Sequence, residues 1–195
     1  DIEQVQALIL VPSRELAIQI EQVIREMGSG FKANAVYGGR PFSKDKIELS
    51  HAPAILIGTP GRVADHLRRG TFETAELKTL VLDEFDKSLE VGFETEMKEI
   101  IEIADKVGAY ILSDEIYIGA ELSNLGTISF QHIYEKTIIT SGLSKSYSHP
   151  GLRIGWIAAD ESVVTKAWEI KDYTTVASSH LSQHIASKVL EPETI

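Results

Sequence analysis

Short apolar runs alternate with helix-period stretches over the first 115 residues of this chain. Runs such as LILV, ILI and LVL do not alternate apolar with polar residues, which favours strands buried on both faces of a parallel sheet. This βαβ series predicts an α/β fold, a three-layer αβα sandwich around a mostly parallel sheet. The predicted strands are residues 6–12, 32–38, 54–59, 79–84 and 109–115, and the predicted helices are residues 14–27, 44–49, 62–69 and 93–107.

The pattern loosens after residue 117 and resumes with a strand at 136–141 and a loop rich in Gly, Ser and Pro. Only the segment HPG separates that loop from a further strand, which begins at Leu152 and ends at Ala158. A crossover to a parallel neighbour needs about a dozen residues or more. We therefore predict that this strand is antiparallel, at or near an edge of the sheet. A helix from about residue 161 into residue 179 and beyond should follow it.

Composition limits the classes of protein that fit this sequence. The chain has 195 residues, 43% of them hydrophobic, so we expect one compact domain over residues 1–195. It has no cysteine, which excludes disulfides, thiolate metal sites and a catalytic thiol. The formal net charge is −10, whereas a nucleic-acid footprint needs clustered Lys and Arg, so a nucleic-acid partner is not expected.

We expect neither a membrane-spanning helix nor a signal peptide in this sequence. No apolar run approaches the roughly 18 to 20 residues of a membrane-spanning helix. The start, DIEQVQALILVP, lacks the basic region of a signal peptide. We expect a soluble, cytoplasmic protein without a membrane partner.

Four motifs follow one another in the first half of the chain. They are Pro12-Ser13-Arg14-Glu15-Leu16-Ala17, Gly38-Gly39, Thr59-Pro60-Gly61-Arg62 and Asp83-Glu84-Phe85-Asp86. In type and order they resemble motif Ia, the GG motif, motif Ib and the DEAD motif of DEAD-box RNA helicases. The resemblance covers about residues 5–102 and implies the first RecA-like domain of that family.

The resemblance assigns chemistry to these residues. Glycines let a backbone approach a phosphodiester, and Thr59 and Arg62 at a strand-to-helix turn can donate to phosphate oxygens. Asp83 and Glu84 would hold a Mg²⁺-bound water and orient a nucleophilic water. The sequence has no match to the phosphate-binding pattern G-x-x-x-x-G-K-[ST], so ATP hydrolysis is not expected. The alternative to a catalytic role for Asp83, Glu84 and Asp86 is that they cap a helix or lie on the solvated surface.

The second half carries a different set of motifs, AYILSDEIY and ITSGLSKSYSHPGLRIGW. From about Lys98 onward the chain resembles the large domain of fold-type I aminotransferases that use pyridoxal phosphate. Lys145 matches the family's Schiff-base lysine and Arg153 the arginine that grips the cofactor phosphate. Asp114 and Tyr117 match the partners of the pyridine nitrogen and the phenolic oxygen.

The match departs from the family pattern near the lysine. Many family members have a serine three residues before it, where this chain has Gly142, so Ser141 and Ser144 are the nearby hydroxyls. The family's asparagine and its substrate-binding arginine have no counterpart in this sequence. Pyridoxal phosphate binding is therefore conceivable and transamination much less so, and the alternative for Lys145 is a solvated surface lysine.

The two resemblances meet in the helix EMKEIIEIADKVG, which places a seam at residues 98–105, with residues 1–102 helicase-like and residues 103–195 aminotransferase-like. The sequence predicts a chimeric α/β scaffold, engineered or recombined, with no evolved catalytic activity and no cofactor. The alternative is residual pyridoxal phosphate binding through Lys145 with slow amine chemistry. A weaker alternative is residual RNA binding through Arg14, Gly39 and Arg62.

Two further expectations concern metals and partners. His180 and His184 are four residues apart on a predicted helix, as zinc ligands could be, but without a third ligand in sight we expect no metal site. No specific partner is expected, and a homodimer is the alternative, through apolar surface that either parent family would cover.

Overall fold

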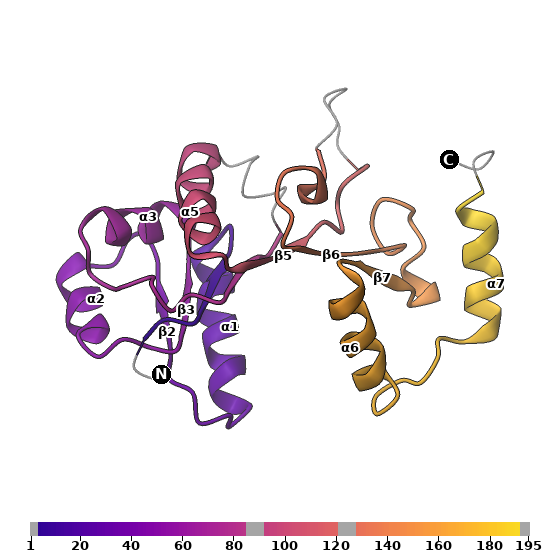
Figure 1. Ribbon diagram of the computed structural model, residues 1–195, viewed down its shortest axis with the longest axis horizontal. Coiled ribbons are helices and arrows are strands. Elements are labelled where there is room, and N and C mark those ends of the chain that lie inside the picture. Colours follow the sequence, from indigo (N-terminus) through magenta and orange to yellow (C-terminus); the bar gives the residue numbers. More distant parts are fainter. Residues whose placement is uncertain (1–3, 85–91, 121–127, 192–195) are drawn as a thin grey trace. The chain divides into compact units, whose positions relative to one another are not determined.

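The computed structural model describes residues 4–84, 92–120 and 128–191. By contacts between Cα atoms, the chain divides into two compact units, Asp1–Ser113 and Asp114–Ile195. Each unit is described by itself below, with the element labels of Figure 1.

The first unit is built on parallel strands. They are β1 (Ala7–Leu10), β2 (Ala33–Val36), β3 (Ile55–Gly58), β4 (Thr79–Leu82) and β5 (Tyr110–Asp114), in the spatial order β2-β3-β1-β4-β5. The central strand β1 pairs with β3 and β4, so that Leu8 lies opposite Leu56 on one side and Leu80 on the other. These three leucines are fully buried, as expected for strands covered on both faces.

Helices connect these strands and cover the two faces of the sheet (Figure 1). They are α1 (Arg14–Glu26), α2 (Phe42–Leu49), α3 (Pro60–Arg68) and α5 (Glu94–Val107). The Ser13 hydroxyl caps α1 by accepting a hydrogen bond from the Leu16 amide at 3.2 Å. Gly108 ends α5 in the left-handed conformation, with φ of 70°.

The core of the first unit has two layers because successive side chains of a strand point to opposite faces. On one face, α1 packs Ala17 against Val11, Ala33, Ala35 and Ile57. The other face carries fully buried leucines of β1, β3 and β4, together with Met97, Ile100 and Ala104 of α5.

The second unit has far fewer buried side chains. Its strands β6 (Thr137–Gly142) and β7 (Gly155–Ala158) pair antiparallel, and α6 (Glu161–Lys171) and α7 (His180–Val189) follow. Two 3₁₀ turns, Phe130–His132 and Pro150–Leu152, complete the described part of this unit. Phe130, 1% exposed, is its largest fully buried side chain, and α6 has no buried residue.

The predicted fold class is confirmed: the protein is α/β, with mostly parallel strands, helices on both faces and one antiparallel strand. The antiparallel strand begins at Gly155 because Leu152 closes a 3₁₀ turn and Arg153 has a positive φ of 54°. The expectation of one domain over residues 1–195 stays a prediction. No helix of the described residues has the length and hydropathy to cross a membrane.

The prediction of one helix from about residue 161 into residue 179 and beyond was wrong in its length. Helix α6 ends at Lys171, whose carbonyl accepts bonds from the amides of Thr174, Thr175 and Val176. The run of β-branched residues 174–176 disfavours helix continuation, and Val176 has a positive φ of 52°.

Gly58 at the end of β3 provides a test of the tight packing in the first unit. A Cβ there would lie 2.6 Å from Val63 Cγ2 and 2.7 Å from the Val36 carbonyl oxygen. We expect Gly58→Ala to lower the free energy of unfolding by about 3 kcal/mol, since backbone must move. Urea denaturation measures this, with Gly38→Ala as the matched control because a Cβ at Gly38 meets nothing within 4 Å. Equal stability of the two variants would contradict the described packing.

Candidate functional site

The loop between β6 and β7 carries Lys145 and is held by main-chain bonds. The Leu143 amide donates to the Ile154 carbonyl at 3.1 Å, and the His149 amide donates to the Leu143 carbonyl at 2.8 Å. The chain approaches itself closely here: a Cβ on Gly142 would lie 2.8 Å from the Ile154 carbonyl oxygen. Position 142 therefore has no room for a side chain such as that of serine.

Serine hydroxyls attach this loop to the segment after β5. Ser146 Oγ lies within donating distance of two carbonyl oxygens, that of Ile116 at 3.2 Å and that of Ile118 at 2.6 Å. Ser141 Oγ donates to the Glu115 carbonyl at 3.1 Å. The buried Glu115 carboxylate in turn accepts the Phe130 amide at 2.7 Å. Residues 115–118 are thereby fixed beside the lysine loop.

This arrangement brings two of the predicted cofactor residues, Lys145 and Tyr117, into contact. Lys145 Nζ lies 5.1 Å from the ring centroid of Tyr117, in cation–π geometry. Asp114, at the end of β5, accepts a long hydrogen bond of 3.4 Å from Thr140 Oγ1. Ser144, adjacent in sequence to Lys145, is half-buried, whereas Lys145 itself is exposed.

Arg153 is not brought into this group by any contact in the described residues. Its side chain is exposed, and Nη1 donates to the Pro150 carbonyl of its own loop at 3.1 Å. A cavity of about 350 Å³ next to the loop is lined by Ile118, Gly119, Ser146–His149 and Val189, and neither Lys145 nor Arg153 lines it. Of the residues that the aminotransferase resemblance assigns to the cofactor, Lys145 and Tyr117 thus lie in cation–π contact, whereas Arg153 is bonded within its own loop.

The helicase-like motif residues occupy separate positions in the first unit. Arg14 is exposed and pairs with Glu15 at 2.5 Å. Gly38 and Gly39 form an exposed turn after β2, with φ of 83° at Gly39. Asp83 and Glu84 follow β4 and are half-buried, and Phe85 and Asp86 lie outside the described residues.

Arg62 belongs to a buried ion-pair network that the sequence did not predict. Its Nε donates to Asp45 Oδ2 at 2.8 Å, and its Nη2 donates to the Arg40 carbonyl at 2.8 Å. The fully buried Asp45 also pairs with Arg40 Nε at 3.1 Å and with His66 Nε2 at 3.2 Å. Thr59, at the start of α3, is 9% exposed. The Arg62 guanidinium is thus occupied by protein groups.

His66 completes this network from α3. Its Nδ1 lies 2.8 Å from Thr71 Oγ1, and its ring stacks on Phe42 with centroids 4.5 Å apart. Burial lowers the pKa of His66, the neighbouring Asp45 carboxylate opposes that shift, and the positive charge of Arg62 adds to it. No sequence signal marked Asp45, because a charged residue between Lys44 and Lys46 is typical of an exposed helix face.

The other histidines do not form a cluster. His180 and His184 are both exposed on α7. Within residues 4–84, 92–120 and 128–191, no group of three or more His, Asp or Glu side chains is arranged to hold a metal ion.

Two family models match the chain. Residues 1–114 match DEAD/DEAH box helicase, and residues 94–195 match aminotransferase class I and II. The matches overlap at residues 94–114, which includes the predicted seam at 98–105. A helicase-like first part and an aminotransferase-like second part are thus confirmed.

Individual proteins agree with this division. ATP-dependent RNA helicase DbpA of Bacillus subtilis (strain 168) is 46% identical over 98 residues, which make up 49% of this chain and 20% of that protein. A DEAD box protein from the hyperthermophile Methanococcus jannaschii has a TM-score of 0.52 and 35% identity, covering 56% of this chain and 31% of its own. This chain therefore spans about a fifth to a third of the length of these helicase relatives.

A further solved structure is similar to nearly the whole chain. A PLP-dependent aminotransferase from Streptococcus suis 89-1591 has a TM-score of 0.57 and 25% identity, covering 94% of this chain and 43% of its own. The structural similarity thus reaches beyond residues 94–195 into the helicase-like part.

Removing the carboxylate of Asp45 tests the buried network. Asp45→Ala leaves two arginines and His66 without their shared partner, so we expect the free energy of unfolding to fall by about 3 kcal/mol. Chemical denaturation measures the loss, and Asp105→Ala, at an exposed position on α5, is the control that should change stability little. A loss no larger than that of the control would contradict a structural role for Asp45.

The pH dependence of stability tests His66. Because its pKa is lowered in the folded state, the unfolded chain binds the proton more readily, and stability should fall as pH drops through about 6.5, the ordinary value for histidine. Unfolding free energies measured between about pH 8 and about pH 5 should decline less steeply in His66→Gln. An identical decline in both proteins would show that His66 does not contribute.

Proposed function

Since residues 1–114 of this chain belong to the DEAD/DEAH box helicase family and residues 94–195 to aminotransferase class I and II, we propose that it is a recombined α/β scaffold without evolved catalytic activity. The supporting observation is that motif residues of both families bond to the protein itself. Arg62 bonds to Asp45 and Arg153 to the Pro150 carbonyl.

In this proposal the helicase motif residues stabilise the folded protein. Phosphate recognition by motif Ib would need donors directed at a phosphodiester. Arg62 instead directs Nε and Nη2 to Asp45 and to the Arg40 carbonyl, with only 13% of its side chain exposed. Exchanging these bonds for phosphate contacts would take Arg62 from the buried Asp45 carboxylate and leave it only Arg40 and His66, which costs stability. RNA binding through Arg62 is therefore not part of the proposal.

The aminotransferase motifs support a second candidate function, reversible binding of pyridoxal phosphate at Lys145. The observation in its favour is the exposed Lys145 amine beside Tyr117. When bound, pyridoxal phosphate supplies an aldehyde and an electron-withdrawing ring. Tyr117 would orient the lysine amine, Ser146 would keep residues 116–118 in place, and Asp114 would offer a carboxylate to a protonated ring nitrogen.

Borohydride trapping distinguishes the two candidates. The protein is titrated with pyridoxal phosphate, reduced and mapped by peptide mass spectrometry, beside Lys145→Ala and the control Lys166→Ala, which removes another exposed lysine. For a scaffold we expect non-saturable labelling, spread over many lysines and equal in both variants. Saturable labelling that maps to Lys145 and disappears only in Lys145→Ala would overturn the scaffold proposal and establish the second candidate.

A further inference from the structure

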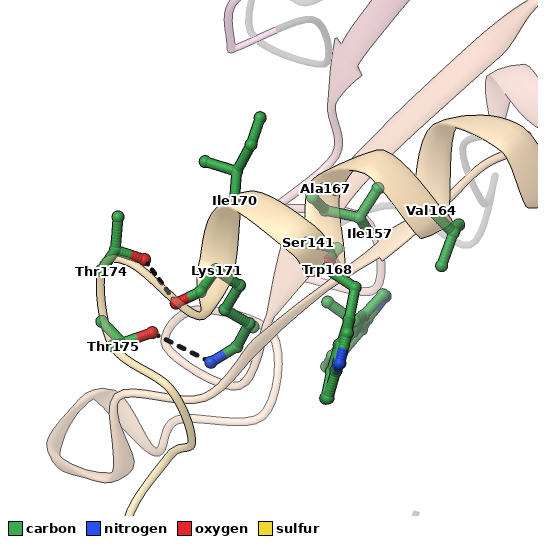
Figure 2. A pocket seen from close by; sticks show the side chains of 11 residues that line it. Ser141, Ile157, Val164, Ala167, Trp168, Ile170, Lys171, Thr174 and Thr175 are labelled. Atoms are coloured by element: carbon green, nitrogen blue, oxygen red, sulfur yellow. Dashed lines mark hydrogen bonds between the residues drawn. The ribbon is translucent and has the colours of Figure 1, made fainter.

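A groove of about 660 Å³ lies between β7 and α6 in the second unit (Figure 2). Its volume is within the range of roughly 300 to 1,000 Å³ that is usual for sites that bind small molecules. Neither Lys145 nor Arg153 lines it, so the groove does not use the cationic residues of the candidate cofactor group. The class of ligand it would take follows from its own lining side chains.

Aromatic and branched apolar side chains form most of this lining. Both tryptophans of the chain, Trp156 of β7 and Trp168 of α6, contribute to it, together with Ile157 and Val164. Trp168 is 62% exposed and Ile157 47% exposed, so these apolar surfaces are accessible to a ligand. The Trp156 ring is oriented by Tyr147, with ring centroids 6.3 Å apart and planes at 73°. Indole rings stack on other flat rings or meet them edge to face, which favours an aromatic ligand.

One end of the groove carries a positive charge. Of the described residues that line the groove, only Lys171 is charged. Its ammonium donates to Thr175 Oγ1 at 2.9 Å and to the Val176 carbonyl at 3.2 Å, and it lies 5.9 Å from the Trp168 ring centroid. In Figure 2, Trp168 and Lys171 lie on one side of α6 and Ile170 points to the other. The two bonds hold the ammonium beside the indole and leave one of its three N–H donors for a ligand.

Thr175 supplies a second donor at this end of the groove. Its Oγ1 accepts the bond from the Lys171 ammonium, so the hydroxyl hydrogen is left to donate to an anion. The Lys171 carbonyl oxygen is already engaged by the amides of residues 174–176. The acidic neighbours Glu169 and Asp172 are exposed and do not line the groove. A carboxylate can therefore accept a charge-assisted bond from Lys171 and a second bond from Thr175.

We propose that the groove between β7 and α6 binds a small aromatic carboxylate, with its ring against Trp156 and Trp168 and its carboxylate on Lys171 and Thr175. The 5.9 Å between the ammonium and the Trp168 centroid suits a carboxylate joined to its ring by a short aliphatic arm, as in 3-phenylpropionate. A mostly apolar lining with a few placed polar groups is the usual composition of a small-molecule site, in which the polar groups fix the orientation of the ligand.

Tryptophan fluorescence tests the site directly, because both tryptophans of the chain line the groove. At constant ionic strength, titration of the whole chain with 3-phenylpropionate should give a saturable change. The neutral 3-phenylpropionamide should bind about tenfold more weakly because it lacks the charge. Propionate, which lacks the ring, should give no saturable change. Absence of saturation with 3-phenylpropionate, or equal affinities for the acid and its amide, would overturn the proposal.

A charge-removing variant tests the assignment of the carboxylate to Lys171. Lys171→Met keeps the apolar stem, so the dissociation constant for 3-phenylpropionate should rise about tenfold while that for the amide stays within about twofold. Lys166→Met, on the same helix but outside the groove lining, is the matched control and should change neither constant. Thermal melting by circular dichroism verifies that both variants are folded. An unchanged constant for the acid in folded Lys171→Met would show that Lys171 does not hold the carboxylate and would overturn the proposal.

Discussion

Main-chain pairing of β5 with β4 is the constraint on which the joining of the two families depends. Leu80 lies opposite Ile111 in this parallel ladder, and the Tyr110 amide donates to the Lys78 carbonyl at 2.8 Å. Ladder bonds use backbone groups that every non-proline residue has, so a strand from one family can pair with a strand from another. The side chains of such a strand must point alternately to the two faces of the sheet. Ile111 and Ser113, two residues apart and so on the same face, are both fully buried.

Helix α5, which precedes β5, can likewise pack on a sheet of either family. Residues 94–114 match both families, and within them α5 buries Met97, Ile100 and Ala104 at helical spacing. Apolar side chains on one side of a helix can pack on many sheets, since volume and pattern matter more than identity. Under the proposed recombination, a junction within such a segment would preserve both the helix and the strand that follows it.

Sequence patterns predicted the features of the fold that depend on a repeated spacing of apolar residues or on a short connection. Runs such as LILV indicated buried parallel strands, and the short HPG connection indicated that β7 is antiparallel. The buried network around Asp45 escaped prediction because its members, Arg40, Asp45, Arg62 and His66, meet only after two helices fold over the sheet. The positive φ of Arg153, which ends the 3₁₀ turn before β7, likewise has no signature in residue type.

The close approach of β6 and β7 limits how this chain can change over evolutionary time. A side chain at Gly142 would meet the Ile154 carbonyl, and one at Gly155 would meet the Ser141 carbonyl, both at less than 3 Å. Glycine is therefore required at both positions, because a main-chain carbonyl of the facing segment leaves no room for a Cβ. A serine at position 142 would require the two strands to separate first, so this position accepts a side chain only together with a change elsewhere.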